Sequence, residues 1–437
     1  MLKKLELINV GPVPQLTMDF GSRINIFTGD NGLGKSFLLD ILWFALTRCW
    51  PAEVNQKLTS GFIAKPFEPG NPSKISFELS TNYRGSINID LEYIPSGPLW
   101  KFPQGRPSIP GLVISAHIDG SFSVWDPTKN YGSKGEIGED FPTRPAAFVF
   151  SPQEVWYGLG TPDGSTRYCN GLLQDIYDWQ KDKDWKIEVF NTILKDMSPA
   201  DWDLSLGTPV KLSLMDSRKI PTIHMPYGDI PILIASAGIK RIFALAYFLS
   251  WALVEHIENC QELGKSVTSP ITFLMDEVEA HLHPKWQRKI IGSLLTIGKQ
   301  KIISQNAKKD SFQIQYFIAT HSPLVMASLE PLFDEKQDKW FDLQMENNGK
   351  IQIISEPFEK KGDANQWLKS NAFDLESTYS VETEEAMDLA RKLLSAEKWD
   401  DSEIKKIYNR LLTLLTPQDN FLFRFRAICD SKGIKLQ

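Results

Sequence analysis

The chain has 437 residues, enough for one large domain or two ordinary ones with a substantial core. Hydrophobic residues make up 42% and charged residues 23%, which is ordinary for a soluble globular protein. The net charge of −6 excludes a basic surface over the whole molecule, although a local cluster of Lys and Arg could still bind phosphates. The four widely spaced cysteines form no C-x-x-C pair, so we expect reduced thiols in a cytoplasmic protein rather than a disulfide framework.

The first segment, MLKKLELINVG, contains only a short apolar stretch, which predicts a first β-strand rather than a signal peptide. A β-prone run at residues 23–27 leads into GDNGLGKS at 29–36, which fits the phosphate-loop pattern G-x-x-x-x-G-K-[ST]. The following segment, 37–50, is apolar almost all round, as a buried helix should be. Strand, glycine-rich turn and helix in this order predict a nucleotide-binding site.

The residues of this loop have distinct expected roles. Glycines at 29, 32 and 34 let the backbone curl so that its N–H groups point at the phosphates. Lys35 is expected to reach the β- and γ-phosphates, and the Ser36 hydroxyl to bind Mg²⁺. The residues expected to contact the nucleotide are Asp30, Asn31, Gly32, Gly34, Lys35, Ser36 and Phe37.

Two regions separate this loop from the next motif. Residues 51–145 hold short alternating strands broken by Gly and Pro, which predict a β-rich lobe, and residues 154–230 predict a mostly helical insertion. The apolar segment 242–254 is shorter than the roughly 20 residues that span a bilayer, so we expect a buried core helix. Just before it, ASAGIKR at 235–241 places small residues at a helix N-terminus. That arrangement suits either phosphate binding or an ordinary Ser N-cap.

An apolar run at 271–275 predicts a buried parallel strand that ends in Asp276 and Glu277. Ligands bind at the carboxyl ends of strands in open α/β sheets. We therefore expect Asp276 to hold Mg²⁺ and Glu277 to polarise the attacking water as a general base. Simple solvation of a strand end is the alternative, which a buried strand disfavours.

A second apolar strand is expected at 314–319, and Thr320-His321-Ser322-Pro323 follows it. A histidine after a strand is usually an ordinary surface or core residue. This one follows the Asp-Glu strand by one helical connection, where a side chain can contact a γ-phosphate. We therefore expect His321 to act in catalysis together with Lys35 and Glu277.

Residues 1–325 are expected to form the main domain, and 326–437 a C-terminal region of short strands followed by a helical tail. One tail helix opens with a Ser-x-x-Glu-like cap and places Leu389, Leu393 and Leu394 on one face. That face would either pack on the main domain or dock a partner, and the sequence leaves both open. The tail supplies no Toprim, HNH or restriction-type nuclease pattern.

The segment ASAGIKR resembles the LSGGQ signature of ABC-type ATPases, with Ser236 and Gly238 retained and Ala237 in place of the first glycine. In that family the signature of one subunit caps the phosphate-loop site of the other. The resemblance implies a homodimer with two ATP molecules at its interface, contacted by Ser236 and Gly238. The family also has a glutamine that senses Mg²⁺ after a central strand. Gln153, after a strand expected at 146–150, is the candidate for this metal-site role.

The opening segment through GLGKS resembles RecF/SMC-type ATPases, and DEVEAHLHPKWQRK resembles a branch that includes the OLD-family nucleases and many prokaryotic defence ATPases. In that branch Glu279, His281 and His283 follow the Asp-Glu pair. A dimer-contacting loop explains these histidines better than a metal site does. Further stretches at 168–180, 236–256 and 367–394 are similar to stand-alone ATPases encoded beside a small HNH-type nuclease, in Septu-type and some retron defence loci.

The resemblance implies an α/β fold: an ABC-ATPase head with a mixed or parallel sheet, a β-rich lobe, a helical insertion and a helical tail. We expect ATP to close the dimer and hydrolysis to reopen it, gating a nuclease effector in antiviral defence. The alternative is a RecF/SMC-like repair ATPase that grips DNA directly. A transporter motor is disfavoured, because its motifs would be more closely spaced. The sequence leaves open whether DNA or RNA contacts this chain directly or through the partner, and whether dimers assemble further.

Overall fold

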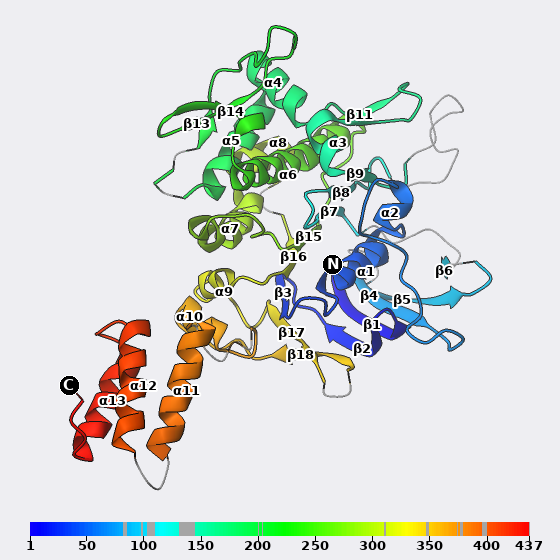
Figure 1. Ribbon diagram of the computed structural model, residues 1–437. Helices are drawn as coiled ribbons and strands as arrows, with labels where there is room; N and C mark the ends of the chain where they lie inside the picture. Colours follow the sequence, from blue (N-terminus) through cyan, green and yellow to red (C-terminus); the bar gives the residue numbers. More distant parts are fainter. Residues whose placement is uncertain are drawn as a thin grey trace. The chain divides into compact units, whose positions relative to one another are not determined.

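The phosphate-loop strand lies inside an eight-stranded mixed sheet, which confirms the expected α/β class. In chain order the strands of this main sheet are β3 (Ile24–Gly29), β7 (Leu112–Ala116), β8 (Phe122–Trp125), β9 (Phe148–Phe150), β15 (Ile271–Asp276), β16 (Ile314–Ala319), β17 (Lys339–Met345) and β18 (Ile351–Glu356). Across the sheet their order is β18-β17-β3-β16-β15-β7-β8-β9 (Figure 1). The five strands from β17 to β7 pair in parallel, so their carboxyl ends share one edge.

The computed structural model describes residues 1–81, 85–97, 99–102, 110–130, 145–199, 201–202, 204–309, 312–346, 349–373, 375, 379–395 and 400–436. The chain divides into two units, Met1–Trp367 and Leu368–Gln437. The boundary expected at residue 325 falls inside the first unit, because β17 pairs with the phosphate-loop strand β3. All four cysteines are buried free thiols.

Helix α1 (Lys35–Thr47), which follows the phosphate loop, is packed between the main sheet and a second sheet. The second sheet has the order β2-β1-β4-β5-β6 and consists of β1 (Leu2–Val10), β2 (Val13–Asp19), β4 (Lys74–Thr81), β5 (Gly85–Ile94) and β6 (Leu99–Lys101). One apolar core joins β1, β4 and β5 to α1 and to the main sheet. Because α1 is covered on both sides, it is apolar almost all round, and a short helix, α2 (Pro51–Val54), follows it.

The expected β-rich lobe at 51–145 is only partly a separate body. Its first strands form β4 to β6, but LVISA and FSVW form β7 and β8 of the main sheet. All five residues of β7 are buried, as a strand covered on both faces requires. The end of the expected lobe, 131–144, lies outside the described residues.

Helix α6 (Ala237–Glu262) packs on the main sheet through aromatic side chains. The Phe248 ring stacks on Phe122 of β8 at 4.3 Å between centroids and meets Phe150 of β9 edge-on at 4.7 Å. The helix is longer than the apolar segment expected from the sequence. It has the length and composition of a membrane span, yet 83% of its most apolar window is buried inside the protein. It is therefore the core helix that the sequence predicts.

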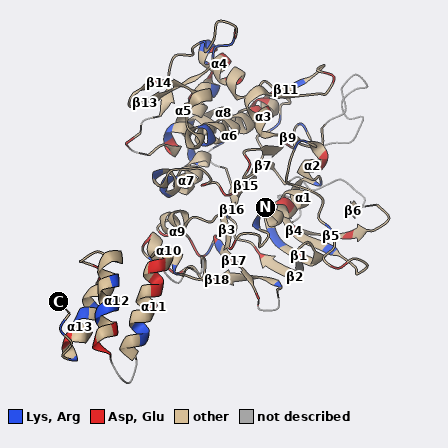
Figure 2. Cartoon of the chain, viewed as in Figure 1, with Lys and Arg blue, Asp and Glu red and all other residues tan. Residues whose placement is uncertain are grey.

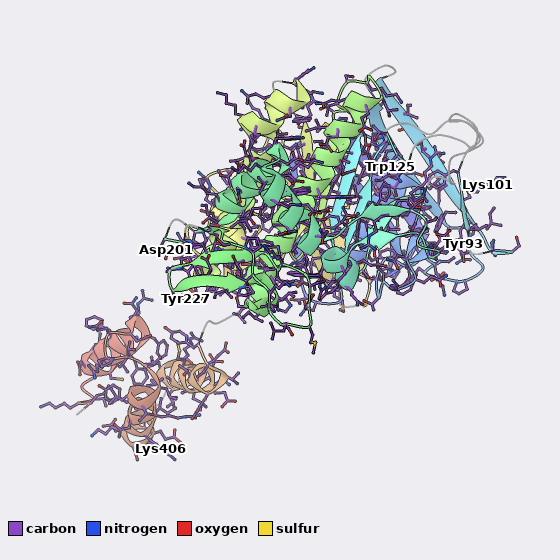
Figure 3. All side chains as sticks on the ribbon, turned by 90° about the horizontal axis from the view of Figure 1, so that it is seen from above. Tyr93, Lys101, Trp125, Asp201, Tyr227 and Lys406 are labelled. Carbon is purple, nitrogen blue, oxygen red and sulfur yellow. The ribbon has the colours of Figure 1, made fainter. Side chains whose placement is uncertain are left out.

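The insertion expected at 154–230 mixes helices with two small sheets, β10-β11 and β12-β13-β14. Its elements are α3 (Pro152–Tyr157), β10 (Leu159–Gly160), β11 (Arg167–Cys169), α4 (Leu172–Asp182), α5 (Trp185–Met197), β12 (Ser205–Leu206), β13 (Thr222–Met225), β14 (Gly228–Pro231) and η1 (Ile232–Ile234). Figure 3 shows Asp201 and Tyr227 of this region at the opposite end of the first unit from Tyr93 and Lys101 of the second sheet. The later helices are α7 (Pro284–Thr296), η2 (Ile297–Lys299), α8 (Lys301–Ala307), α9 (Pro323–Leu329) and α10 (Ala364–Leu368).

The second unit contains the helices α11 (Val381–Ser395), α12 (Asp401–Leu414) and α13 (Asn420–Ser431). Its core is built from all three helices, with Ala386 and Ala390 of α11 fully buried. Leu393 and Leu394 pack against this core, but Leu389 is 44% exposed. The buried face of α11 is therefore centred on the two alanines and not on the three leucines, because small side chains allow the closest packing of helices.

A buried histidine ties α6 to two loops of the first unit. His256 Nδ1 lies 2.9 Å from Asp126 Oδ1, and His256 Nε2 lies 2.6 Å from Thr268 Oγ1. Burial lowers the pKa of His256, but the hydrogen bond and charge of Asp126 outweigh burial and raise it to about 9. Because the pKa of His256 is higher in the folded than in the unfolded protein, protonation of His256 stabilises the folded state. This stabilisation is complete at a pH below the unfolded-state pKa and is lost as the pH rises through about 9.

We predict that His256→Gln lowers the free energy of unfolding by about 3 kcal/mol at pH 6, because the substitution leaves Asp126 as an unpaired buried charge. The difference between the two proteins should shrink as the pH is raised from 8 to 10. Urea unfolding at each pH measures both effects. A deficit that stays constant up to pH 10 would contradict the assignment of a charged His256.

Candidate nucleotide site

The phosphate loop joins β3 to α1 as the sequence predicts. Gly34, with φ of 89°, is the N-cap of α1, and no side chain caps this helix. The first backbone N–H groups of α1 are therefore left for an anion, which the helix dipole also favours. Gly29 is required for a different reason, since a Cβ there would lie 2.3 Å from the carbonyl oxygen of Leu343 in β17.

Lys35 is buried against its own loop. Its Nζ donates to the carbonyl oxygens of Gly29 and Asp30, at 2.8 and 2.9 Å. Burial lowers the pKa of Lys35, and the charges of Glu277 and Asp276 act against that shift. A phosphate bound in the loop would replace two neutral acceptors with a charged one, which is the stronger partner for an ammonium group.

The structure brings Ser36 together with Asp276. Burial raises the pKa of Asp276, and a hydrogen bond with Ser36 acts against that shift. Asp276 Oδ1 is buried and has no hydrogen-bond partner among the described residues. An unsatisfied carboxylate oxygen beside a hydroxyl fits Mg²⁺, which takes its remaining ligands from phosphate and water. Nowhere in the described ranges do three His, Cys, Asp or Glu side chains form a metal cluster.

Glu277 and His321 face each other across neighbouring strands. His321 Nε2 lies 3.5 Å from Glu277 Oε1. Burial and the charge of Lys35 lower the pKa of His321 to about 4, so the imidazole is neutral at pH 7 and the contact is not an ion pair. Burial also raises the pKa of Glu277. Glu277 has φ of 45°, a conformation that is costly for a non-glycine residue and that occurs at functional sites.

Arg241 of α6 is the last residue of the signature segment 235–241, and no role in the site was expected for it from the sequence. It is 9% exposed, its Nη2 donates to the His117 carbonyl oxygen at 2.8 Å, and its Nη1 is buried without a partner among the described residues. Burial lowers the pKa of Arg241, whereas the charges of Asp119, Asp276 and Glu279 act against that shift. The carboxylates at this edge are thus balanced by two buried cations, Lys35 and Arg241.

The signature residues lie at the start of α6, away from the phosphate loop. The Ser236 side chain is the N-cap and accepts a hydrogen bond from Ile239 N at 3.5 Å. A Cβ on Gly238 would lie 2.7 Å from the His281 carbonyl oxygen, so close packing alone requires this glycine. Residues 236–239 line a cavity of about 620 Å³ with His281, His283 and Trp286, and no phosphate-loop residue lines it. The contacts of Ser236 and Gly238 with a nucleotide stay a prediction.

Gln153 is exposed in the first turn of α3, after β9. β9 is the last strand of the main sheet and lies three positions from β15. At about 4.8 Å per strand this separation is about 14 Å. On that side of β15 the adjoining strand is β7, and His117 and Asp119 are among the residues that follow it. The metal role of Gln153 therefore stays a prediction that the sheet order does not support.

A second unpredicted residue, Asp342, is buried beneath the loop. Its Oδ1 accepts a hydrogen bond from Thr28 Oγ1 at 2.7 Å, and the Trp340 indole donates to the same hydroxyl at 2.8 Å. These bonds tie β17 to the last residues of β3. In the sequence, Asp342 is one polar residue in the strand segment FDLQM at 341–345, and nothing there indicates that it links two strands. Only the pairing of β17 with β3 reveals this link.

Comparison with known families locates these segments in ATPase domains. Residues 4–101 match a family described as "AAA domain" and contain the phosphate loop. Residues 224–327 match the family described as "AAA domain, putative AbiEii toxin, Type IV TA system" and contain the signature, Asp276, Glu277 and His321. The phosphate loop, the signature, Asp276, Glu277 and His321 thus all lie in segments that are similar to AAA domains.

The protein is similar to two curated bacterial ATPases. "Retron Ec83 probable ATPase" of Escherichia coli is 25% identical over 213 residues, which cover 47% of this chain and 33% of that relative. "Retron Vc95 probable ATPase" of Vibrio cholerae serotype O1 biovar El Tor is 27% identical over 280 residues, which cover 61% and 49%. The chain thus spans between a third and a half of these relatives. A solved SMC head bound to the C-winged helix domain of ScpA aligns at 16% identity and a TM-score of 0.43, covering 82% of this chain and 98% of that one.

We predict that Lys35→Ala weakens binding of Mg-ATP to the chain by about 100-fold, because a buried charge-assisted contact to phosphate is lost. Titration calorimetry measures the dissociation constant. Lys101→Ala, at an exposed position in β6, is the matched control and should bind normally. Equal affinity of both variants would contradict the assignment of the phosphate loop.

Proposed function

We propose that this chain is a Mg²⁺-dependent ATPase that dimerises around ATP and gates a partner effector, a nuclease, in antiviral defence. One observation carries the ATPase step: the ends of three adjacent parallel strands bring the catalytic candidates together. β3 leads into the phosphate loop, β16 ends before His321, and β15 ends in Asp276 and Glu277. The AAA-domain matches support the same reaction class.

In this proposal the α1 N-terminus and Lys35 bind the β- and γ-phosphates, and Ser36 and Asp276 hold Mg²⁺. The metal ion, when bound, neutralises charge on the phosphate oxygens. Glu277 accepts a proton from the attacking water, and its raised pKa makes it a better base than an ordinary carboxylate. The neutral imidazole of His321 donates its one N–H to the γ-phosphate.

The geometry of the signature supports a composite site made by two copies of the chain. Ser236 and Gly238 line a cavity that contains none of the phosphate-loop residues of the same chain. A serine and a glycine at a helix N-terminus suit contact with a phosphate brought by a second copy. ATP would therefore join two copies, and hydrolysis would separate them, which gives the two states that a gated effector needs.

The partner effector is proposed from similarity, because both curated relatives are named retron ATPases. The sequence resemblance to ATPases encoded beside an HNH-type nuclease makes such a nuclease the expected partner. Leu214, Met215 and Tyr227 of the insertion are 101%, 97% and 71% exposed, and we expect partner contacts there. Lys and Arg are interspersed with Asp and Glu along the chain in Figure 2.

We predict that Glu277→Gln binds ATP but hydrolyses it at least about 100-fold more slowly, so that the ATP-bound dimer accumulates. Adding Ser236→Arg to this variant should leave nucleotide binding intact and keep the chain monomeric, since the arginine blocks the signature. Light scattering after size exclusion measures the mass with and without Mg-ATP. Dimers that form equally with Ser236→Arg would contradict the composite site.

We also predict that tagged Glu277→Gln, purified from its native host with Mg-ATP, retains a small nuclease in stoichiometric amount. The same purification with Lys35→Ala should lose it, because the closed state does not form. Mass spectrometry identifies the retained proteins. Retention of DNA without any protein partner would favour the repair ATPase instead.

A further inference from the structure

Glu279 lies two residues after Glu277 and reaches back to the turn that carries His321. Its Oε1 accepts a hydrogen bond from Thr320 Oγ1 at 2.6 Å and another from His321 N at 2.7 Å. The residue is only 7% exposed, so these bonds form away from water. Hydrogen bonds to a buried carboxylate are short, directional and costly to lose. The backbone of His321 is thus held by a side chain from the segment that carries Glu277.

The same segment holds the next residue of the turn as well. Ser322 Oγ donates to Gln287 Oε1 at 2.7 Å, and Gln287 Nε2 donates to the Leu282 carbonyl oxygen at 2.9 Å. Glu279 and Gln287 therefore each hydrogen-bond to the 320–322 turn. A strand-end pairing adds a third link, because Glu277 N donates to the Ala319 carbonyl oxygen at 3.0 Å. Glu277 and His321 consequently belong to one hydrogen-bonded body.

The second carboxylate oxygen of Glu279 indicates that this residue does more than hold the 320–322 turn in place. Glu279 Oε2 is buried and has no hydrogen-bond partner among the described residues, and the same holds for Asp276 Oδ1 and Arg241 Nη1. These three atoms belong to groups that interact electrostatically at the same edge of the sheet. Unsatisfied buried polar atoms are rare in folded proteins, and each requires an explanation. Eleven buried side-chain atoms lack a partner among the described residues, and three of them lie around this one candidate site, where they belong to charged groups.

We propose that Glu279 is a positioning residue for ATP hydrolysis: it fixes the Thr320–His321 turn so that the His321 imidazole stays beside the Glu277 carboxylate. The inference rests on the proposed ATPase function. The hydrogen bonds of Oε1 set the position of His321, and the peptide backbone between 277 and 279 makes the base and the histidine move together. Nucleotide binding itself does not involve Glu279, because no phosphate-loop residue bonds to it.

The test compares Glu279→Gln with Glu279→Ala in the full chain. The glutamine keeps an oxygen that accepts from Thr320 and His321, so its kcat should stay within about 3-fold of the native value. The alanine leaves both donors without an acceptor and lets His321 shift, so kcat should fall on the order of 100-fold. Because binding is untouched, KM and the Mg-ATP dissociation constant should change by less than about 3-fold in both variants.

Glu330→Ala is the matched control for loss of a buried glutamate. Glu330 is 9% exposed, and its Oε1 accepts from Lys361 N, Gly362 N and the Trp367 indole at 2.7 to 2.9 Å. Its removal should lower the melting temperature as much as Glu279→Ala does, with kcat unchanged. A normal kcat in Glu279→Ala, or an equal loss in Glu279→Gln and Glu279→Ala, would overturn the positioning role. Lys35→Ala, assayed in parallel, separates the two claims: if it hydrolyses ATP normally, the proposed function fails instead.

Discussion

The Asp276 carboxylate is buried at the end of a central strand, and the rest of the site is arranged around that charge. A buried carboxylate is costly unless cations and hydrogen-bond donors surround it. Lys35 comes from the phosphate loop, Arg241 from α6 and Ser36 from the first turn of α1. Lys35 and Ser36 lie more than two hundred residues before Arg241 and Asp276, and the parallel pairing of β3, β16 and β15 brings the phosphate loop to the edge that carries Asp276.

Different helices cover the two faces of the main sheet, and they contribute different parts of the candidate site. On one side α1, the helix that follows the phosphate loop, is enclosed between two sheets in one apolar core. On the other side α6 joins two functions in one helix. Ser236 caps its first turn, and Arg241, little more than one turn later, reaches the carboxylate edge of the same chain. The helix that carries the signature thus also supplies a cation to the carboxylate edge.

The sequence predicted the parts of the fold whose signal is local. The phosphate loop, the Asp276 strand and the His321 strand each carry an apolar run followed by a chemical motif, and their bounds agree with the structure to within two residues. The strand order could not be predicted, since it depends on contacts between distant segments. That is why β7 and β8 were assigned to a lobe, and why Gln153 was preferred over the residues that follow β7. Asp342 and Arg241 were missed for a related reason: a lone charged residue carries no signal until a neighbour in space explains its burial.

The proposed ATPase cycle depends most on a composite site, in which the phosphate loop of one copy works with the signature of another. Mixing two inactive variants, Lys35→Ala and Ser236→Arg, tests this most directly. In a mixed dimer one site combines the intact phosphate loop of the Ser236→Arg chain with the intact signature of the Lys35→Ala chain. The account predicts that each variant alone is inactive and that the mixture regains ATP hydrolysis. A mixture that stays as inactive as its components would contradict it.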